Sequence, residues 1–345
     1  MPVFWFIILA VLLGIFFMFE GYEWGTRIVY GLYTSNDDER KQVFKSVQSV
    51  WAANEIWLLA FLGVSYWVFP EFFRWLQHFF APLFYVIIFL YVLTVVLNNL
   101  IRIFWDKPFR RFLDTLLLVA QAGIVLLFGL MLAIFLRGWD GDAPRLWSRN
   151  FSPFSGQSGY LDWFTLLFTL FFFIVILLEG LGWTVHKVTP ALARKLKFVI
   201  QRLAIYGLIL YLILMISLYF LHKDLLHYYI IYPAWFILPL LTLSAFAGLM
   251  AIRTYAKNNK GYFLATNLFI YFWLGLMVLK YPYLIRSVSG SGGINIFQTE
   301  FHDLTAYNGH WWVIAVAVLL LIYSILIHKY YKGRSLRERI RESTP

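Results

Sequence analysis

The sequence predicts an all-α integral membrane protein with nine transmembrane helices, which form two four-helix bundles and one peripheral helix. Of its 345 residues, 61% are apolar and only 14% are charged, and the mean hydropathy is +0.71. A soluble domain of this size could not bury so much apolar surface. In addition, nine stretches reach or approach the roughly 20 apolar residues that span a bilayer. These stretches are residues 3–19, 56–73, 79–100, 112–136, 163–185, 198–221, 229–252, 262–278 and 311–327.

We expect the whole chain, residues 1–345, to form one membrane domain. Helices 1 to 4 occupy about residues 3–136, helices 5 to 8 about residues 161–285, and helix 9 about residues 310–328, before a basic tail at 329–345. The first stretch lacks the basic residues that precede the apolar core of a secretory signal, so it is expected to remain as a helix. Residues 27–50 carry apolar side chains three or four positions apart, which is typical of an amphipathic segment in the membrane interface.

The distribution of lysine and arginine predicts the orientation of the chain. Of the 29 basic residues, 22 fall after the first, third, fifth and seventh predicted helices or in the C-terminal tail. Because basic residues gather on the cytoplasmic side of a membrane, the N-terminus is expected outside and the C-terminus in the cytoplasm. The formal charge of +11 indicates contact with lipid headgroups rather than with nucleic acid.

Four glutamates are the main candidate functional residues: Glu20, Glu23, Glu55 and Glu179. A charge within apolar membrane sequence costs several kcal/mol, so such acids usually face a protein interior or a wet cavity. A partly buried carboxyl group can exchange protons near neutral pH. For Glu20 and Glu55 two interpretations stay open, a proton relay or a polar joint between helices, whereas the interfacial position of Glu23 favours the joint.

Six further side chains near the predicted helix ends are candidates for supporting a proton path. They are Trp51, Asn54, Trp57, Asn98, Asn99 and Arg102. Three of them also have a simpler interpretation. Arg102 can extend to lipid headgroups or pair with a glutamate, and the two tryptophans can belong to an aromatic belt at the interface.

The residue types present exclude several kinds of chemistry. The chain has no cysteine, which rules out disulfides, thiolate metal sites and cysteine nucleophiles. All seven histidines fall at predicted helix ends or in loops, which disfavours haem ligation at membrane depth. No spacing indicates a closed metal site, a hydrolase nucleophile or a phosphate-binding loop. We therefore expect no catalytic residue, metal or haem on this chain, and any activity must involve protons, quinones or a partner.

One weak internal repeat is visible. The run Glu-Gly-Tyr-Glu-Trp at 20–24 ends the first predicted helix, and Glu-Gly-Leu-Gly-Trp at 179–183 ends the fifth. An acid, a glycine and a tryptophan thus recur four helices later, which suits two four-helix halves.

Four runs follow one another in a distinctive order and spacing: Glu-Gly-Tyr-Glu-Trp-Gly at 20–25, Asn-Asp-Asp-Glu-Arg-Lys at 36–41, Trp-Ala-Ala-Asn-Glu-Ile-Trp at 51–57 and Phe-Pro-Glu at 69–71. In order and spacing, they resemble subunit II of the cytochrome bd-type quinol oxidases. Weaker similarity extends along the rest of the chain, including Tyr-Pro-Tyr at 281–283 after the eighth helix.

This resemblance implies a haem-free subunit in the cytoplasmic membrane of a prokaryote, paired with a haem-bearing subunit I that holds haems b and d. Together the two subunits would oxidise quinol and reduce dioxygen to water, with protons taken from the cytoplasm. The resemblance associates the acids at Glu20 and Glu23 with the proton path. It also leaves room for a structural quinone or lipid in a groove between the helix bundles, and for a small accessory subunit.

Three departures from the family pattern bear on the proton path. The family has Asp and Gly where this chain has Ala52 and Ala53, and the acid that ends the third helix is replaced by Asn98 and Asn99. A Pro-Pro pair of the fourth helix is also missing. A nine-helix transporter or channel and a purely structural subunit without a proton path are the alternative functions.

Overall fold

The computed structural model describes residues 2–47, 54–105, 108–139, 160–252, 259–287 and 293–297, with isolated positions 315, 318, 319 and 322. The ninth predicted helix and the basic tail lie almost entirely outside these residues, as does Trp51. The count of nine helices therefore stays a prediction.

The described chain is almost entirely helical. It contains α1 (Pro2–Tyr33), α2 (Asp37–Val47), α3 (Glu55–Val68), α4 (Pro70–Ile103), α5 (Arg110–Arg137), α6 (Trp163–Lys187), α7 (Pro190–Leu221), η2 (Lys223–Leu226), α8 (His227–Ile231), η3 (Pro233–Phe236), α9 (Ile237–Met250), α10 (Asn259–Lys280), β1 (Tyr283–Ile285) and β2 (Ile294–Asn295). The two short strands pair antiparallel and form a small hairpin that the sequence did not predict.

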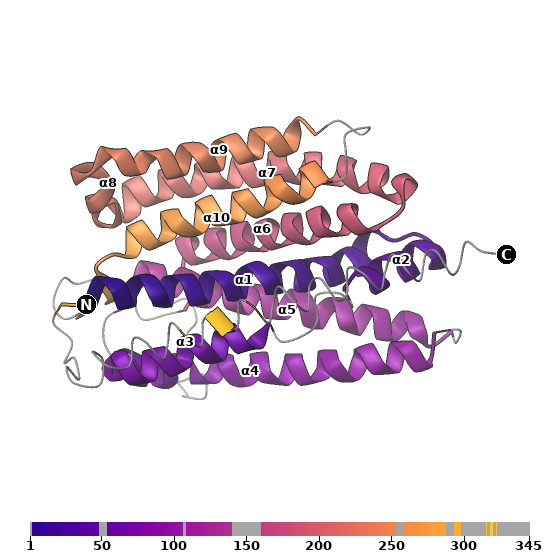
Figure 1. The fold of residues 1–345 in the computed structure, drawn as a ribbon, viewed down its shortest axis with the longest axis horizontal. Coiled ribbons are helices and arrows are strands. Elements are labelled where there is room, and N and C mark those ends of the chain that lie inside the picture. The colour runs from indigo at the N-terminus through magenta and orange to yellow at the C-terminus, as the bar shows by residue number, and fades with distance from the viewer. Residues whose placement is uncertain are drawn as a thin grey trace.

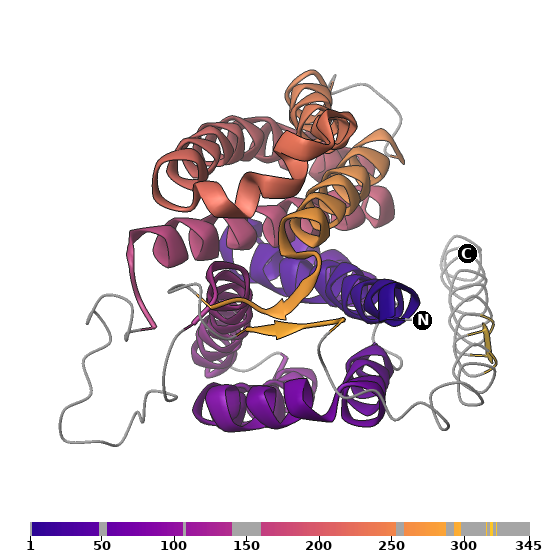
Figure 2. The same ribbon diagram turned by 90° about the vertical axis from the view of Figure 1, so that its left-hand side faces the viewer.

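The long helices run side by side, with α1 and α6 at the centre (Figure 1). α3, α4 and α5 lie on one side of α1, and α7, α9 and α10 lie around α6 on the other (Figure 2). α1 packs directly on α6, α3, α5 and α10. The core is continuous across these contacts and contains many phenylalanine and tryptophan rings.

The two central helices approach most closely where glycine faces glycine. A Cβ atom built on Gly25 would lie 2.8 Å from the Cα atom of Gly180, and a Cβ atom on Gly180 would collide with the backbone of Gly25. Small residues allow membrane helices to bring their backbones into contact. The runs 20–24 and 179–183, which resemble each other in sequence, therefore meet at this crossing.

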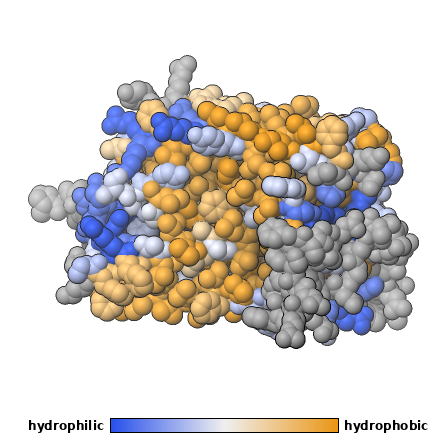
Figure 3. All heavy atoms as spheres, turned by 180° about the vertical axis from the view of Figure 1, so that it is seen from behind, coloured by the Kyte–Doolittle hydropathy of each residue, from blue (hydrophilic) through white to orange (hydrophobic). Residues whose placement is uncertain are grey.

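The prediction of an all-α polytopic membrane protein is confirmed. Seven described helices are long and apolar enough to cross a bilayer. On the face shown in Figure 3, a broad apolar band lies between hydrophilic residues gathered toward the two ends of the molecule. Helix α3 is too short to cross a bilayer by itself, because its 14 residues rise only about 21 Å. A hydrocarbon core is roughly 30 Å thick.

Several predicted helix boundaries are wrong, including the starts of the predicted spans 79–100 and 198–221, which begin at Pro70 and Pro190. The first helix does not end at residue 19 but continues to Tyr33, so only Asp37–Val47 of the predicted interfacial segment forms a separate helix. The predicted span 56–73 breaks at Phe69, because a proline disfavours helical geometry in the residue before it. The predicted span 229–252 is likewise interrupted at Tyr232, ahead of Pro233.

The N-terminus of α6 is fixed by a capping box. The Asp162 carboxylate accepts from the Thr165 N–H at 2.6 Å, and Arg137 Nη1 donates to the same carboxylate at 2.6 Å. Burial alone would raise the pKa of Asp162, but the Thr165 N–H and the Arg137 guanidinium together hold that pKa below its usual value. This cap joins the end of α5 to the start of α6.

Replacing Asp162 with Ala is expected to destabilise the protein by about 1 kcal/mol at pH 7, the typical value of a helix cap. A lowered pKa gives stability that is present above the usual Asp value of about 4 and is lost as the pH falls through the folded value. Thermal unfolding of both proteins between pH 3 and 7 checks this. The difference in melting temperature should shrink toward pH 3, and a difference that grows on acidification would contradict the assignment.

Candidate functional site: a buried polar stripe on α1

Four polar side chains form a stripe along one face of α1. Glu20, Glu23, Arg27 and Tyr30 are three, four and three positions apart, which places them on the same side of a helix. None is more than 5% exposed. Burial of so many polar groups on one face requires partners on neighbouring helices.

At the α2 end of the stripe, a cluster of ion pairs joins three helices. Tyr30 donates to Asp114 Oδ1 at 2.6 Å, and Arg40 Nη1 lies 3.3 Å from Asp114 Oδ2. Arg110 pairs with both Asp114 and Asp37. The hydrogen bond from Arg110 lowers the pKa of Asp37, which is exposed on α2. This cluster, which we call the surface cluster, connects the stripe with the outside of the bundle.

The middle of the stripe is an ion pair within α1. Arg27 Nη2 lies 2.5 Å from Glu23 Oε1, and both side chains are at most 7% exposed. Asn54 Nδ2 donates to the other carboxylate oxygen of Glu23 at 3.5 Å. Beside Arg27 is a cavity of about 20 Å³, which Asn98 and Arg102 also line. A cavity of this size has room for about one water molecule.

Glu20 lies at the inner end of the stripe. Its side chain is fully buried, and neither carboxyl oxygen has a hydrogen-bond partner among the described residues. Glu23, Glu55, Arg27 and the Tyr91 hydroxyl lie within electrostatic reach. A buried carboxyl without fixed donors is costly as an anion and is usually a site where protons bind or pass.

An aromatic cluster closes the space beyond Glu20. The rings of Phe16, Phe17, Trp24 and Phe128 are all nearly buried. Trp24 stacks on Phe128 with ring centroids 5.2 Å apart, and Phe17 meets Phe128 edge to face at 5.5 Å. The polar stripe therefore ends at Glu20 and does not continue along α1.

Glu179 lies apart from this stripe, on α6. It is fully buried, and both of its carboxyl oxygens lack hydrogen-bond partners in the described part of the chain. Its carboxyl carbon lies 3.1 Å from the position that a Cβ atom on Gly21 would take. Glu179 thus contacts α1 at Gly21, the residue between Glu20 and Tyr22.

The other predicted site residues occupy varied positions. Glu55 is exposed on this chain at the first turn of α3, and Trp57 is buried in the same helix. Asn98 is buried and donates to the Thr94 carbonyl, so it lines the cavity without bridging two helices. Asn99 is exposed.

Arg102 is also exposed, and its guanidinium lies 5.8 Å from the centre of the Phe44 ring on α2. Of the predicted residues, the structure thus brings Glu20, Glu23, Glu55 and Asn54 together.

Sequence reasoning missed the α2 end of the stripe. Arg27 and Tyr30 were assigned to an interfacial segment, because the predicted first helix ended at residue 19. Their spacing from Glu20 and Glu23 is the signal that could have revealed them. The partners Asp114 and Tyr91 could not be found in this way, since they come from α5 and α4.

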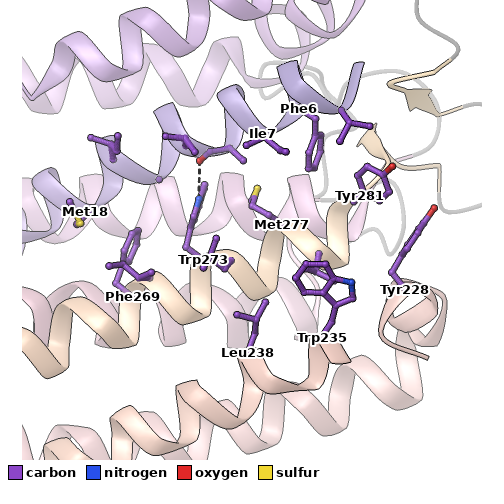
Figure 4. Close-up of a pocket in the computed structure, with 18 of the residues that line it drawn as sticks. Phe6, Ile7, Met18, Tyr228, Trp235, Leu238, Phe269, Trp273, Met277 and Tyr281 are labelled. Atoms are coloured by element: carbon purple, nitrogen blue, oxygen red, sulfur yellow. Dashed lines mark hydrogen bonds between the residues drawn. The ribbon is translucent and has the colours of Figure 1, made fainter. Parts of the chain in front are cut away.

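A separate apolar groove of about 910 Å³ lies between α1, α10 and the α8 to α9 region (Figure 4). Phe6 and Met18 line it from α1, and Phe269 and Trp273 line it from α10. The Trp273 indole donates to the Ala10 carbonyl at 2.9 Å, which fixes the wall between the two helices. The groove has the shape and polarity of a site for a long hydrocarbon chain.

No group of three or more potential metal ligands occurs among the described residues. The stripe offers carboxyl and hydroxyl groups, which can bind or pass protons, beside the permanent positive charge of Arg27. The stripe lies inside a multi-pass helical membrane protein. The fold and the stripe together therefore define an integral membrane protein with buried proton-binding groups.

Comparison with known proteins gives the family. The chain belongs to the cytochrome bd terminal oxidase subunit II family, whose model matches residues 1–331. The cytochrome bd ubiquinol oxidase subunit 2 of Bacillus subtilis (strain 168) is 36% identical over 67 residues, which is 19% of this chain and about a fifth of the Bacillus protein. The match to a bd oxidase structure from Geobacillus thermodenitrificans spans 96% of this chain and 98% of the Geobacillus chain, with a TM-score of 0.66 and 12% identity. That structure shows the shared fold.

Proposed function

We propose that this chain is the haem-free subunit of a membrane quinol:oxygen oxidoreductase and pairs with a haem-bearing subunit I. The family membership and the fold shared with a bd oxidase support this proposal. The histidines at predicted helix ends and in loops support a haem-free role. Haems b and d would then belong to the partner, and quinol would be the electron donor.

We further propose that the stripe on α1 supplies protons for oxygen reduction. The observation that carries this is the buried carboxyl of Glu20 at the end of the stripe, which accepts no hydrogen bond within normal distance from any described residue. Protons would enter at the surface cluster, which is on the cytoplasmic side if the orientation predicted from the basic residues holds. They would pass Tyr30 and the cavity at Arg27 and reach Glu23 and then Glu20. Exposed Glu55, within electrostatic reach of Glu20, would face subunit I.

The experiment that tests the proposal is purification of the native complex through a tag on this chain. We expect a second multi-helix subunit, haem bands in the reduced-minus-oxidised visible spectrum, and oxygen consumption with a quinol. A lone polypeptide without haem would overturn the proposal and favour a transporter. An active complex indifferent to substitution of Glu20 would favour a purely structural subunit.

We also propose that the groove of Figure 4 holds the tail of a lipid or quinone. Its lining is almost wholly apolar, and Trp235 and Tyr281 lie at one end. Quinone or lipid extracted from the complex should fall by at least about half in a Val11→Trp variant, since the indole fills space in the groove. Val119→Trp is the control, because Val119 is exposed on α5 outside the groove. Equal loss in both variants would contradict this assignment.

A further inference from the structure

Three apolar spaces follow one another along α1, from the groove of Figure 4 into the half of the bundle that contains α3, α4 and α5. We propose that these spaces admit dioxygen, which enters from the lipid side at the groove and passes two small cavities inside the bundle. The inference rests on the proposed function, because an oxygen-reducing complex must be supplied with this gas. Its first test is made without turnover.

The first support is the junction between the groove and a second cavity, which has a volume of about 20 Å³. Phe6, Ala10 and Met277 line both spaces. Figure 4 shows Phe6 on α1 and Met277 on α10 at the groove. The second cavity therefore lies directly behind the wall of the groove.

The second support is a third cavity, of about 50 Å³, farther into the bundle. Leu13, Phe61 and Phe135 line both the second and the third cavity. Side chains in a packed interior still change rotamer, so these three residues separate the two cavities without closing the way between them permanently.

The third support is the kind of molecule that the third cavity can hold. All the described residues that line it are apolar, among them Leu58, Leu76 and Met131. A water molecule would find no hydrogen-bond partner there, and cavities of this kind stay dry. Ligand pockets for larger molecules have volumes of roughly 300 Å³ or more, so a lipid tail or a quinone ring does not fit. A small apolar molecule is left.

The second cavity includes one charged residue, Lys280, in its lining. The Lys280 ammonium group donates to the Phe135 carbonyl and lies 3.9 Å from the centre of the Phe135 ring. The charge is thus directed to the end of α5, and the wall of the second cavity is apolar.

The groove is where dioxygen would enter. Ile7, Val11 and Leu274 line it and are each about half exposed in the described part of the chain. Dioxygen is apolar and dissolves better in hydrocarbon than in water, so it is more concentrated in the bilayer beside these residues. A lipid or quinone tail in the groove is itself hydrocarbon and leaves this entry open to the gas.

The position of the third cavity gives the direction of the route. α3 contributes Leu58 and Phe61 to its lining, and α3 also carries exposed Glu55, which is proposed to face subunit I. A void larger than one water molecule weakens the packing around it. A route for dioxygen toward the haem-bearing partner accounts for a void at this place.

The first test is a structure of the purified complex under xenon gas, which is an apolar and electron-dense probe. Xenon is expected in the third cavity of the wild type. Leu132→Phe should displace it, because Leu132 lines this cavity and the larger ring takes up its space. Leu240→Phe is the matched control, since Leu240 is exposed on α9 and lines none of the three spaces. An empty third cavity in the wild type, or an ordered water molecule in it, would overturn the inference.

The second test is the dependence of turnover on dioxygen concentration. Leu13→Phe narrows the junction between the two cavities and does not touch the groove. It should lower kcat/KM for dioxygen roughly tenfold, since association rates vary by about one to three decades among variants of one site. The kcat at saturating dioxygen should stay unchanged, because the chemistry after binding is the same.

Leu240→Phe should keep the wild-type kcat/KM for dioxygen. An unchanged kcat/KM in Leu13→Phe, or an equal loss in Leu240→Phe, would overturn the route. If Leu13→Phe does not assemble, Phe61→Trp narrows the same junction from α3. Failure of the proposed function would show as a complex without haem or oxygen uptake, whereas failure of this inference alone would leave both in place.

Discussion

Glu20→Gln is expected to lower quinol-dependent oxygen consumption roughly 100-fold, which is the scale of losing one proton-transferring group. Glutamine has nearly the same shape as glutamic acid but cannot release a proton. The substitution should therefore leave the α1 packing, the haem spectrum and the amount of complex unchanged. Oxygen uptake by purified complex, normalised to haem, measures the effect.

The control for this variant is Glu71→Gln. Glu71 lies exposed in the first turn of α4, outside the stripe, so the same chemical change should leave turnover as it is. Glu20→Asp should recover part of the activity, because it restores a carboxyl on a shorter side chain. Full turnover in Glu20→Gln would show that the stripe has only a structural role.

Gly180→Ala is expected to prevent stable assembly. The added Cβ atom would collide with the backbone of Gly25, which cannot rotate away as a side chain can. Forcing extra volume into a packed interior costs about 3 kcal/mol or more when backbones must separate. The yield of folded protein and its melting temperature in mild detergent should both fall sharply.

Gly261→Ala is the matched control for this glycine contact. A Cβ atom on Gly261 would meet only the methyl ends of Ile200 and Ile252 at 3.7 Å, an ordinary contact distance. Its melting temperature should stay close to that of the wild type. Normal assembly of Gly180→Ala would mean that α1 and α6 are not in backbone contact.

The hydropathy of the chain predicted where most helices lie but not where they end. The last 14 residues of α1 contain Glu20, Glu23 and Arg27. Because these residues are charged, the apolar stretch that predicted the first helix ends before them. They stay helical because α2 and α5 cover them and supply partners such as Asp114. Such partners come from distant parts of the sequence and cannot be read from local spacing.

The candidate site was predicted in part. Glu20 and Glu23 were identified as polar residues in apolar sequence, and the structure places them on one buried stripe with Arg27 and Tyr30. The exposure of Glu55 and the separate position of Glu179 depend on how four helices pack around α1. The repeat at 20–24 and 179–183 did not by itself predict that its glycines form the contact between α1 and α6. The structure shows this contact.

The most direct test of the proton path is proton uptake by the fully reduced complex after an oxygen pulse, followed with a pH-indicating dye. In the wild type, uptake from the side that carries α2 should keep pace with haem oxidation. In Glu20→Gln, the first electron-transfer step should stay fast while proton uptake lags roughly 100-fold. Proton uptake that remains as fast in Glu20→Gln as in the wild type would contradict a path through this stripe.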